Sequence, residues 1–197
     1  MTPTGKAKGT AAAVAAAIIA AVLTVEGGYV NNPKDPGGAT NHGVTERVAR
    51  EHGYAGDMRN LTKDQATQIY AQDYIKTPGY EPLLELSPAV AEELVDSAVN
   101  AGPGRASRWF QMSLNALNRG GTDYPDLVVD GRVGPGTIRA YEKLIERRGQ
   151  VKACQLTIKL LDANQAAHYV SLGHLEAFTP GWVDHRIGNV PLSKCAG

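Results

Sequence analysis

The sequence predicts a mainly α-helical fold, and three observations support this. The chain has 197 residues, of which 43% are apolar and 20% charged, which suits one globular domain or one domain with a small appendage. Apolar residues recur at helical spacing, and capping residues or Gly-Pro stops separate the runs. Alternating strand patterns are missing, apart from a possible small hairpin around residues 29–45.

The N-terminal run Gly9–Val25 is uncharged and rich in alanine, and it follows Lys6 and Lys8. A helix over this run is about 26 Å long, just short of a hydrocarbon core of ~30 Å. The lysines would hold its start in the cytoplasm and send the rest outward. Because alanine methyl groups supply little transfer free energy, we expect a weak membrane segment that can leave the membrane again.

The same segment has two other interpretations. Apolar side chains recur at helical spacing: Val14, Ile18, Val22 and Val25, with Ile19 and Leu23 beside them. This stripe is typical of a helix that packs on a protein core, and a segment could first rest in the membrane and then pack. Ala-x-Ala patterns also fit a cleaved signal peptide, but cleavage near Ala21 would leave Glu26 close to a new terminus.

Caps and apolar spacing predict further helices along the chain. Thr62 and Gln65 form a capping box that opens a helix through about Ile75. Ser87-Pro88 opens the next helix, and Gly102-Pro103 ends it. The remaining expected helices span residues 105–118, about 138–145, 151 to about 172, and a last turn at 182–187.

Composition gives the expected domains and limits the partners. The alanine-rich helix over 1–25 precedes a catalytic part over 26–120, and the shift at Gly120–Asp130 separates that part from a helical region over 121–197, which is expected to bind the cell wall. The 20 basic and 20 acidic residues cancel, which argues against nucleic acid as a partner. We expect a monomer. Cys154 and Cys195 match no zinc spacing, and the sequence leaves open whether they pair.

Residues 26–45 contain the candidate catalytic residues. Glu26 ends the first predicted helix, and Asp35 and Thr40 follow on a glycine-rich loop. Two carboxylates and a hydroxyl can cleave a glycosidic bond: one acid protonates the leaving oxygen, and the second group positions water or stabilises the developing cation. We expect burial and the helix dipole to disfavour the charged form of Glu26, which keeps it protonated as a donor. No His-Glu-x-x-His pattern or full calcium loop occurs, so no metal or cofactor is expected.

Several short motifs follow one another along the first 120 residues: Glu26-Gly27-Gly28-Tyr29-Val30, Asp35-x-Gly37-Gly38-Ala39-Thr40, Gly43-Val44-Thr45, Ile69-Tyr70 with Asp73-Tyr74, and Asp96-x-Ala98-Val99-Asn100. With these motifs the first 120 residues resemble glycoside hydrolase family 108, the phage endolysins related to phage lysozymes. The resemblance implies a lysozyme-like helical fold with a small β-hairpin near the active site. Ile75 stands where a tryptophan is expected, and Asn32 where many relatives carry aspartate.

The resemblance also implies roles for single residues. Glu26 matches the catalytic acid, and Asp35 and Thr40 match an aspartate and a threonine that help hold the attacking water. Their spacing is one residue shorter than in related phage lysozymes, and Thr45 competes for the hydroxyl role. The residues expected to line the saccharide cleft are Tyr29, His42, Thr45, Tyr70, Tyr74 and Asn100.

Simpler roles compete with these assignments. Asp35 could be a turn residue, since Lys-Asp-Pro-Gly favours turns, and Thr40 could be a loop hydroxyl that caps backbone. Tyrosines on helices are commonly core residues, a loop histidine such as His42 is commonly just solvated, and a structural hydrogen bond is expected for Asp96. Residues 130–137, Asp-Gly-Arg-Val-Gly-Pro-Gly-Thr, resemble a turn of peptidoglycan-binding modules, but a plain glycine turn before a helix is the alternative.

The resemblance implies an endolysin, a lysozyme-type N-acetylmuramidase that hydrolyses the β-1,4 bond between N-acetylmuramic acid and N-acetylglucosamine in peptidoglycan during host lysis. A water-holding Asp35 and Thr40 imply inversion, with a carboxylate gap of roughly 6.5–9.5 Å, whereas a gap near ~5 Å would imply retention. A lytic transglycosylase with Glu26 as sole catalytic residue and a non-catalytic wall-binding protein are the alternatives. We expect inner-membrane tethering followed by release to the periplasm (signal-anchor-release); the alternative is the host cytoplasm until holin-mediated release.

Overall fold

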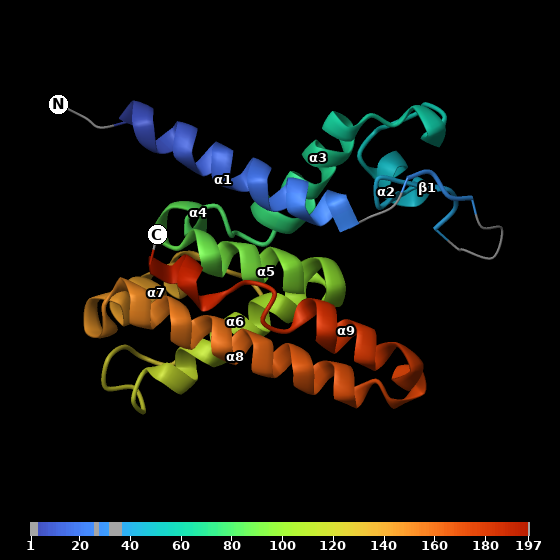
Figure 1. The fold of residues 1–197 in the computed structure, drawn as a ribbon. Helices are drawn as coiled ribbons and strands as arrows, with labels where there is room; N and C mark the ends of the chain where they lie inside the picture. Colours follow the sequence, from blue (N-terminus) through green and yellow to red (C-terminus); the bar gives the residue numbers. More distant parts are fainter. Residues whose placement is uncertain (1–3, 26–27, 32–36, 197) are drawn as a thin grey trace. The chain divides into compact units, whose positions relative to one another are not determined.

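The computed structural model describes residues 4–25, 28–31 and 37–196, and it is mainly helical (Figure 1). In these ranges one two-stranded antiparallel sheet occurs. The predicted fold class is therefore confirmed. The chain divides into two compact units, Met1–Thr77 and Pro78–Gly197. This division coincides with neither boundary expected from composition, and the three-part domain assignment stays a prediction.

Helix α1, Thr4–Val25, opens the first unit (Figure 1). Its buried apolar side chains are Ile18, Ile19, Val22 and Leu23. The helix packs on α3, Lys63–Ala71, which agrees with the core-packing interpretation of this stripe. Val14 is only half-buried, and the side chain of Val25 is outside the described set. Within the described ranges, no helix has the length and apolarity needed to cross a membrane.

The predicted capping box is present at the start of α3. The Thr62 hydroxyl accepts from Gln65 N at 3.2 Å, and the Gln65 side-chain oxygen accepts from Thr62 N at 3.0 Å. The sequence predicted one helix through Ile75, but α3 passes into a π-helical turn, η2, over Gln72–Lys76. Ile75 is 2% exposed, so the position where a tryptophan was expected belongs to the core.

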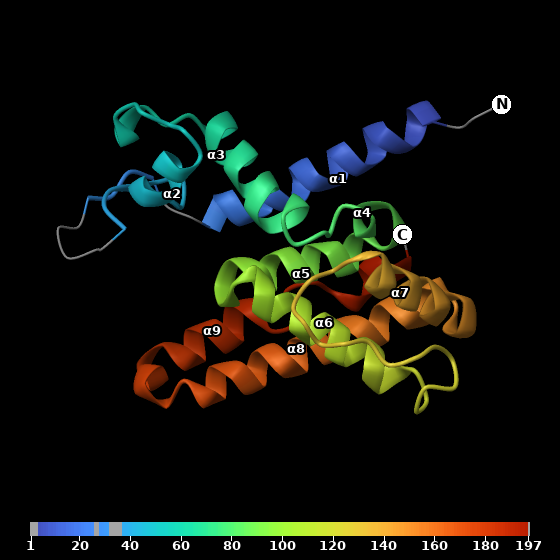
Figure 2. The same cartoon turned by 180° about the vertical axis from the view of Figure 1, so that it is seen from behind.

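The second unit is a helical bundle around α5, Pro88–Ala101, α6, Pro103–Leu117, and α8, Gln150–Ser171, which pack on one another (Figures 1 and 2). Helix α7, Pro135–Arg148, lies against α6 and α8, and α4, Leu83–Leu86, precedes α5. The fully buried side chains of the second unit include Leu94, Phe110, Leu114, Tyr141, Leu144, Ile158 and Leu161. Burial of these side chains supplies the main stabilising term.

Two helices of this unit differ from their predicted bounds. The helix expected over about 138–145 is longer, because Pro135 starts it and Gly149, at φ 77°, ends it. The last turn, expected at 182–187, is helix α9 over Thr179–Arg186, with a proline in its first turn. Short 3₁₀ segments η3, Gly173–Phe178, and η4, Leu192–Ala196, flank it.

A buried glutamine holds the glycine-rich turn before α7. Gln111 of α6 donates to the Asp130 carboxylate at 2.8 Å and to the Arg132 carbonyl at 3.0 Å, and its own oxygen accepts from Gly131 N at 2.9 Å. Gly131 has φ +81°, and a Cβ there would lie 2.9 Å from the carbonyl oxygen of Gly104. The turn therefore has a structural role as the connection between α6 and α7.

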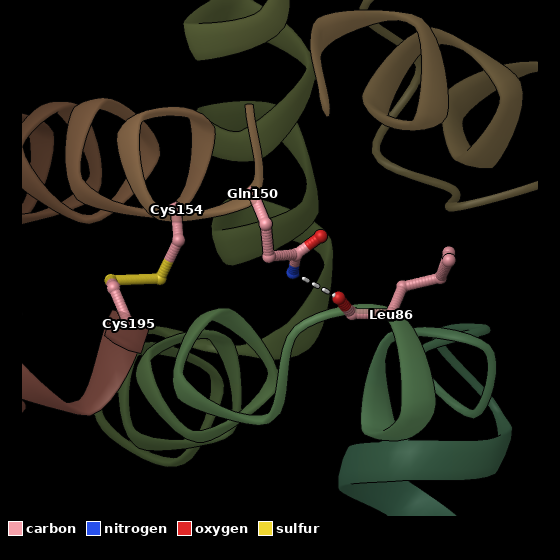
Figure 3. The surroundings of a disulfide bond; sticks show 4 residues. All are labelled: Leu86, Gln150, Cys154 and Cys195. Carbon is pink, nitrogen blue, oxygen red and sulfur yellow. Dashed lines mark hydrogen bonds between the residues drawn. A yellow bond between two sulfur atoms is a disulfide. The ribbon is translucent and has the colours of Figure 1, made fainter. Parts of the chain in front are cut away.

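The sequence left the pairing of the two cysteines open, and the structure shows a disulfide between Cys154 of α8 and Cys195 of η4 (Figure 3). Lys194 of the same C-terminal segment contacts both carboxylate oxygens of Glu92 on α5 at 2.7 Å. The start of α8 is held nearby, where the Gln150 amide donates to the Leu86 carbonyl (Figure 3). These links fix the C-terminal segment to the bundle.

Glu93 is a buried carboxyl group in the middle of α5. Its exposure is 0%, and neither side-chain oxygen has a hydrogen-bond partner among the described residues. Burial, and next the negative charges of Asp162, Asp96 and Glu92, raise the pKa of Glu93 to about 9. The side chain is therefore neutral at physiological pH, because its ionised form would lie unpaired in the core.

We predict that Glu93→Gln stabilises the protein and flattens the pH dependence of its unfolding. Between the ordinary pKa of 4.5 and the folded pKa of about 9, the native state keeps a proton that the unfolded state releases. The free energy of unfolding of the native sequence should thus fall by up to about 1.4 kcal/mol per pH unit as pH rises through this window. Urea unfolding from pH 5 to pH 9 measures the slope. Glu142→Gln, at an exposed position, should leave this slope unchanged. A slope in Glu93→Gln equal to that of the native chain would contradict the raised pKa of Glu93.

Candidate active site

A small hairpin forms the centre of the candidate site. Strands β1, Thr40–Asn41, and β2, Val44–Thr45, pair antiparallel, with Thr40 opposite Thr45. The two turn residues, His42 and Gly43, both have positive φ, at 50° and 73°. This backbone is typical of the tight turn that suits a twisted two-residue hairpin, and histidine adopts it more readily than a β-branched residue would. The predicted hairpin is present.

Backbone hydrogen bonds fix the position of Thr40. Val30 N donates to Thr40 O, and Thr40 N donates to Val30 O, both at 2.8 Å. Val30 and Thr40 therefore form an isolated antiparallel β-bridge. Thr40 is half-buried. Glu26 and Asp35, the predicted acid and its partner, lie outside the described residues.

Asn41 anchors the hairpin to the rest of the first unit. Its side chain is 5% exposed, and its amide donates to the carbonyl of Met58 at 2.7 Å and, more weakly, to that of Leu61 at 3.5 Å. Met58 starts the 3₁₀ segment η1, Met58–Asn60. Sequence reasoning missed this residue, although an asparagine directly before a His-Gly turn was the available signal.

Thr45 caps a short helix, α2, Glu46–Glu51. Its hydroxyl accepts from Val48 N at 3.4 Å, as an N-cap residue does. The first two amides of α2 also bind the preceding loop, because Glu46 N donates to Ala39 O at 2.7 Å and Arg47 N donates to Gly37 O at 3.2 Å. The structure thus gives the Thr45 hydroxyl a structural contact at the start of α2.

The tyrosines predicted to line the cleft have different environments. Tyr70 of α3 is buried and Tyr74 of η2 is half-buried, and their ring centroids lie 5.2 Å apart. Tyr29 is exposed, and the guanidinium carbon of Arg59 lies 5.3 Å from its ring centroid, within the range of a cation–π interaction. Of the three, Tyr29 therefore has the ring most accessible to a ligand.

Two acidic residues of the family-like motifs make structural contacts. Asp73 of η2 binds His52 Nε2 through both carboxylate oxygens, at 2.9 and 3.0 Å. Asp96 of α5 accepts from Arg186 of α9 at 2.7 Å, which agrees with its predicted structural hydrogen bond. Burial raises the pKa of Asp96, and the charge of Arg186 opposes this shift.

Asn100, the last predicted substrate contact, belongs to the second unit. Its amide donates to the backbone carbonyl of Asp96 at 2.8 Å and to the Asp96 carboxylate at 3.4 Å. The structure thus brings Thr40, His42 and Thr45 together in one hairpin and pairs Tyr70 with Tyr74, whereas Asn100 lies on a separate unit. No cluster of three or more histidine, cysteine or acidic side chains suited to a metal occurs in the described part of the chain.

Comparisons with known proteins agree with the resemblance. The family model for glycosyl hydrolase 108 matches residues 19–102, and a model described as a predicted peptidoglycan domain matches residues 105–187. A solved structure, Brucella abortus SagA, is 30% identical with a TM-score of 0.67, and the alignment covers 96% of this chain and 95% of that one. A comparison with curated sequences finds no match.

The fold and the two family matches define a glycoside hydrolase that acts on peptidoglycan and carries a peptidoglycan-binding region. The chain belongs to glycosyl hydrolase family 108. The family match contains Glu26, Asp35, Thr40 and Asn100, so it spans both compact units.

We predict that Asn41→Ala loosens the hairpin and lowers both stability and wall hydrolysis. Loss of the buried amide leaves the carbonyl of Met58 without its partner, which costs about 1–3 kcal/mol. Thermal unfolding and turbidity loss of cell walls, assayed well below the midpoint of unfolding, measure the two effects. Asn60→Ala, an exposed change on the adjoining η1, is the control. Native stability in Asn41→Ala would show that the hairpin does not depend on this contact.

Proposed function

We propose that the protein is an N-acetylmuramidase that hydrolyses the β-1,4 bond between N-acetylmuramic acid and N-acetylglucosamine. Membership of family 108, with Glu26, Asp35 and Thr40 inside the matched residues 19–102, carries the proposal. Glu26 follows directly after Val25, the last residue of α1. A carboxyl group at a helix C-terminus is disfavoured in its charged form, which suits a general acid.

The closed loop supports a shared site for Glu26 and Thr40. Glu26 and Val30 are four positions apart in the sequence, so their Cα atoms lie within about 14 Å even in a fully extended chain. Val30 is in turn hydrogen-bonded to Thr40. Chain connectivity thus limits how far Thr40 can lie from Glu26, which is compatible with one saccharide that contacts both residues.

In the proposed reaction Glu26 donates a proton to the glycosidic oxygen as the bond to the muramic acid carbon breaks. Asp35 and Thr40 hold a water molecule on the opposite face of the sugar, Asp35 accepts its proton, and the oxygen attacks the same carbon. This arrangement inverts the configuration and needs roughly 6.5–9.5 Å between the carboxyl groups. No step requires a cofactor.

We further propose that the enzyme acts outside the cytoplasm, as an endolysin that opens the wall of a phage host and so has antimicrobial activity. The disulfide between Cys154 and Cys195 supports this location, since structural disulfides persist in oxidising compartments. Transient tethering to the inner membrane through residues 1–25, and a monomeric state, remain predictions.

We predict that Glu26→Gln lowers the rate of wall hydrolysis by on the order of 10²–10⁴, because glutamine cannot donate the proton. Mass spectrometry of digested peptidoglycan identifies the bond cut, and Glu51→Gln, on the exposed face of α2, is the matched control.

Two outcomes would contradict the proposal. Products with 1,6-anhydro ends would indicate a lytic transglycosylase, in which a sugar hydroxyl replaces water. A native rate in Glu26→Gln would mean that Glu26 is not the acid.

For the location, we predict that the protein sediments with membranes in energised cells and becomes soluble when the membrane potential collapses. The released protein should resist thiol alkylation, because both cysteines are in the disulfide. Fractionation with and without an uncoupler measures the first effect, with a cytoplasmic marker enzyme as control. Protein that is found only in the cytosol, with alkylatable thiols and release that needs a separate pore, would favour the holin-dependent alternative.

A further inference from the structure

Three aromatic rings form a row where α8 leads into α9 in the second unit. The ring of Trp182 lies between Tyr169 and Phe178, with centroid distances of 5.3 Å and 5.9 Å. The Phe178 and Trp182 rings are stacked, with an interplanar angle of 25°. We call these three side chains the aromatic row.

The aromatic row leads from the core to the solvent. Tyr169 is buried, Trp182 is half-buried, and Phe178 is 59% exposed. Two valines on the same helices, Val170 and Val183, are also exposed. Because exposed apolar clusters on soluble proteins commonly mark binding surfaces, this end of the unit is a candidate for ligand contact.

Contacts behind the aromatic row hold it in place. The Tyr169 hydroxyl accepts from the Gln165 amide at 2.8 Å, and Gln165 in turn accepts from Ser97 of α5 at 3.2 Å. At the end of α9, Arg186 binds the Asp96 carboxylate, and this ion pair is largely buried. Rings that are already fixed lose little conformational entropy on binding, so their contact with a ligand is more favourable.

The chemistry of the surface fits a glycan. The peptidoglycan-domain match, residues 105–187, contains every residue of the aromatic row and its supports on α8 and α9. A pyranose ring has an apolar C–H face that stacks on an aromatic ring, and a rim of hydroxyl and acetamido groups that hydrogen-bond to polar side chains. Asp184 and His185 are exposed on α9 and can supply such bonds.

Charge argues against a lipid surface as the occupant. Segments that bind anionic membranes carry lysine and arginine beside their apolar residues. Here the residues that flank Phe178 and Trp182 include Glu176 and Asp184, both exposed, and the one arginine of α9 is paired with Asp96.

We propose that Phe178 and Trp182 form a stacking platform for the glycan strand of peptidoglycan, separate in sequence from the catalytic hairpin. The platform would retain the enzyme on the polymer between cuts. This inference rests on peptidoglycan as the substrate of the proposed function, but it is independent of which bond is cut and of which residue is the acid.

The test is sedimentation of the full chain with purified, insoluble peptidoglycan on ice. Phe178→Ala should weaken binding about three- to tenfold, the loss expected for one aromatic stacking contact. Phe178→Trp should retain binding, because it keeps an aromatic face. Val128→Ala, at an 81% exposed position away from α8 and α9 in sequence, is the matched control and should bind as the native chain does.

A second readout uses Trp182 itself. The chain has two tryptophans, so Trp109→Phe leaves Trp182 as the only indole reporter. Soluble peptidoglycan fragments should then change its fluorescence in a saturable way, and Phe178→Ala should shift the midpoint to higher concentration by the same factor.

Native binding by Phe178→Ala would overturn the proposal. The proposal would also fail if Phe178→Trp weakened peptidoglycan binding as much as Phe178→Ala does. It would fail as well if Phe178→Ala lost binding to anionic phospholipid vesicles but kept its binding to peptidoglycan. The binding assay does not depend on catalysis: if the native chain cuts no glycosidic bond, the proposed function fails while the effect of Phe178→Ala still decides the platform.

Discussion

The two backbone hydrogen bonds between Val30 and Thr40 are the constraint on which the candidate site depends. They join the two ends of the stretch from Val30 to Thr40, and the sequence of that stretch includes Asp35, one of the residues proposed to be catalytic. The hairpin beyond Thr40 is locked by the buried amide of Asn41, and the N-terminus of α2 binds the loop carbonyls of Gly37 and Ala39. A short segment with little apolar area thus obtains its shape from hydrogen bonds.

In the second unit, hydrogen bonds between buried polar groups also fix the arrangement of the helices. Gln111 holds the turn before α7, Gln165 connects α5 with Tyr169, and Asp96 binds Arg186 of α9. Such contacts specify one arrangement of packed helices, where apolar packing alone would allow several. Glu93 is the exception, because its carboxyl group is buried without a partner among the described residues. The disulfide at Cys154 adds a covalent link to the C-terminal segment.

Much of the fold could be predicted from the sequence, since helices depend on local signals. The capping box at Thr62 predicted the start of α3, and the proline and glycine at the two ends of α5 predicted its bounds to within a few residues. The π-helical turn at Gln72 was missed because no sequence pattern distinguishes it from an α-helix. A structural hydrogen bond was predicted for Asp96, but its partner Arg186 was not, because residues so distant in sequence are brought together only by folding.

For the candidate site, the structure bears on the hairpin and leaves the catalytic roles as predictions. The hairpin around His42 was expected from the sequence and is present, whereas the roles of Glu26 and Asp35 rest on their chemistry and on the family resemblance and stay predictions. The anchoring role of Asn41 and the stacking of Phe178 on Trp182 depend on which side chains become neighbours after folding, and local sequence carries little information on that.

A crystal structure of Glu26→Gln with a bound peptidoglycan oligosaccharide would test the proposed roles of Glu26 and Thr40. We expect a glycosidic oxygen within hydrogen-bonding distance of the side chain at position 26, and the Thr40 hydroxyl on the opposite face of the same sugar, next to an ordered water. A saccharide bound away from both positions, or a Thr40 hydroxyl directed away from the sugar, would contradict these roles.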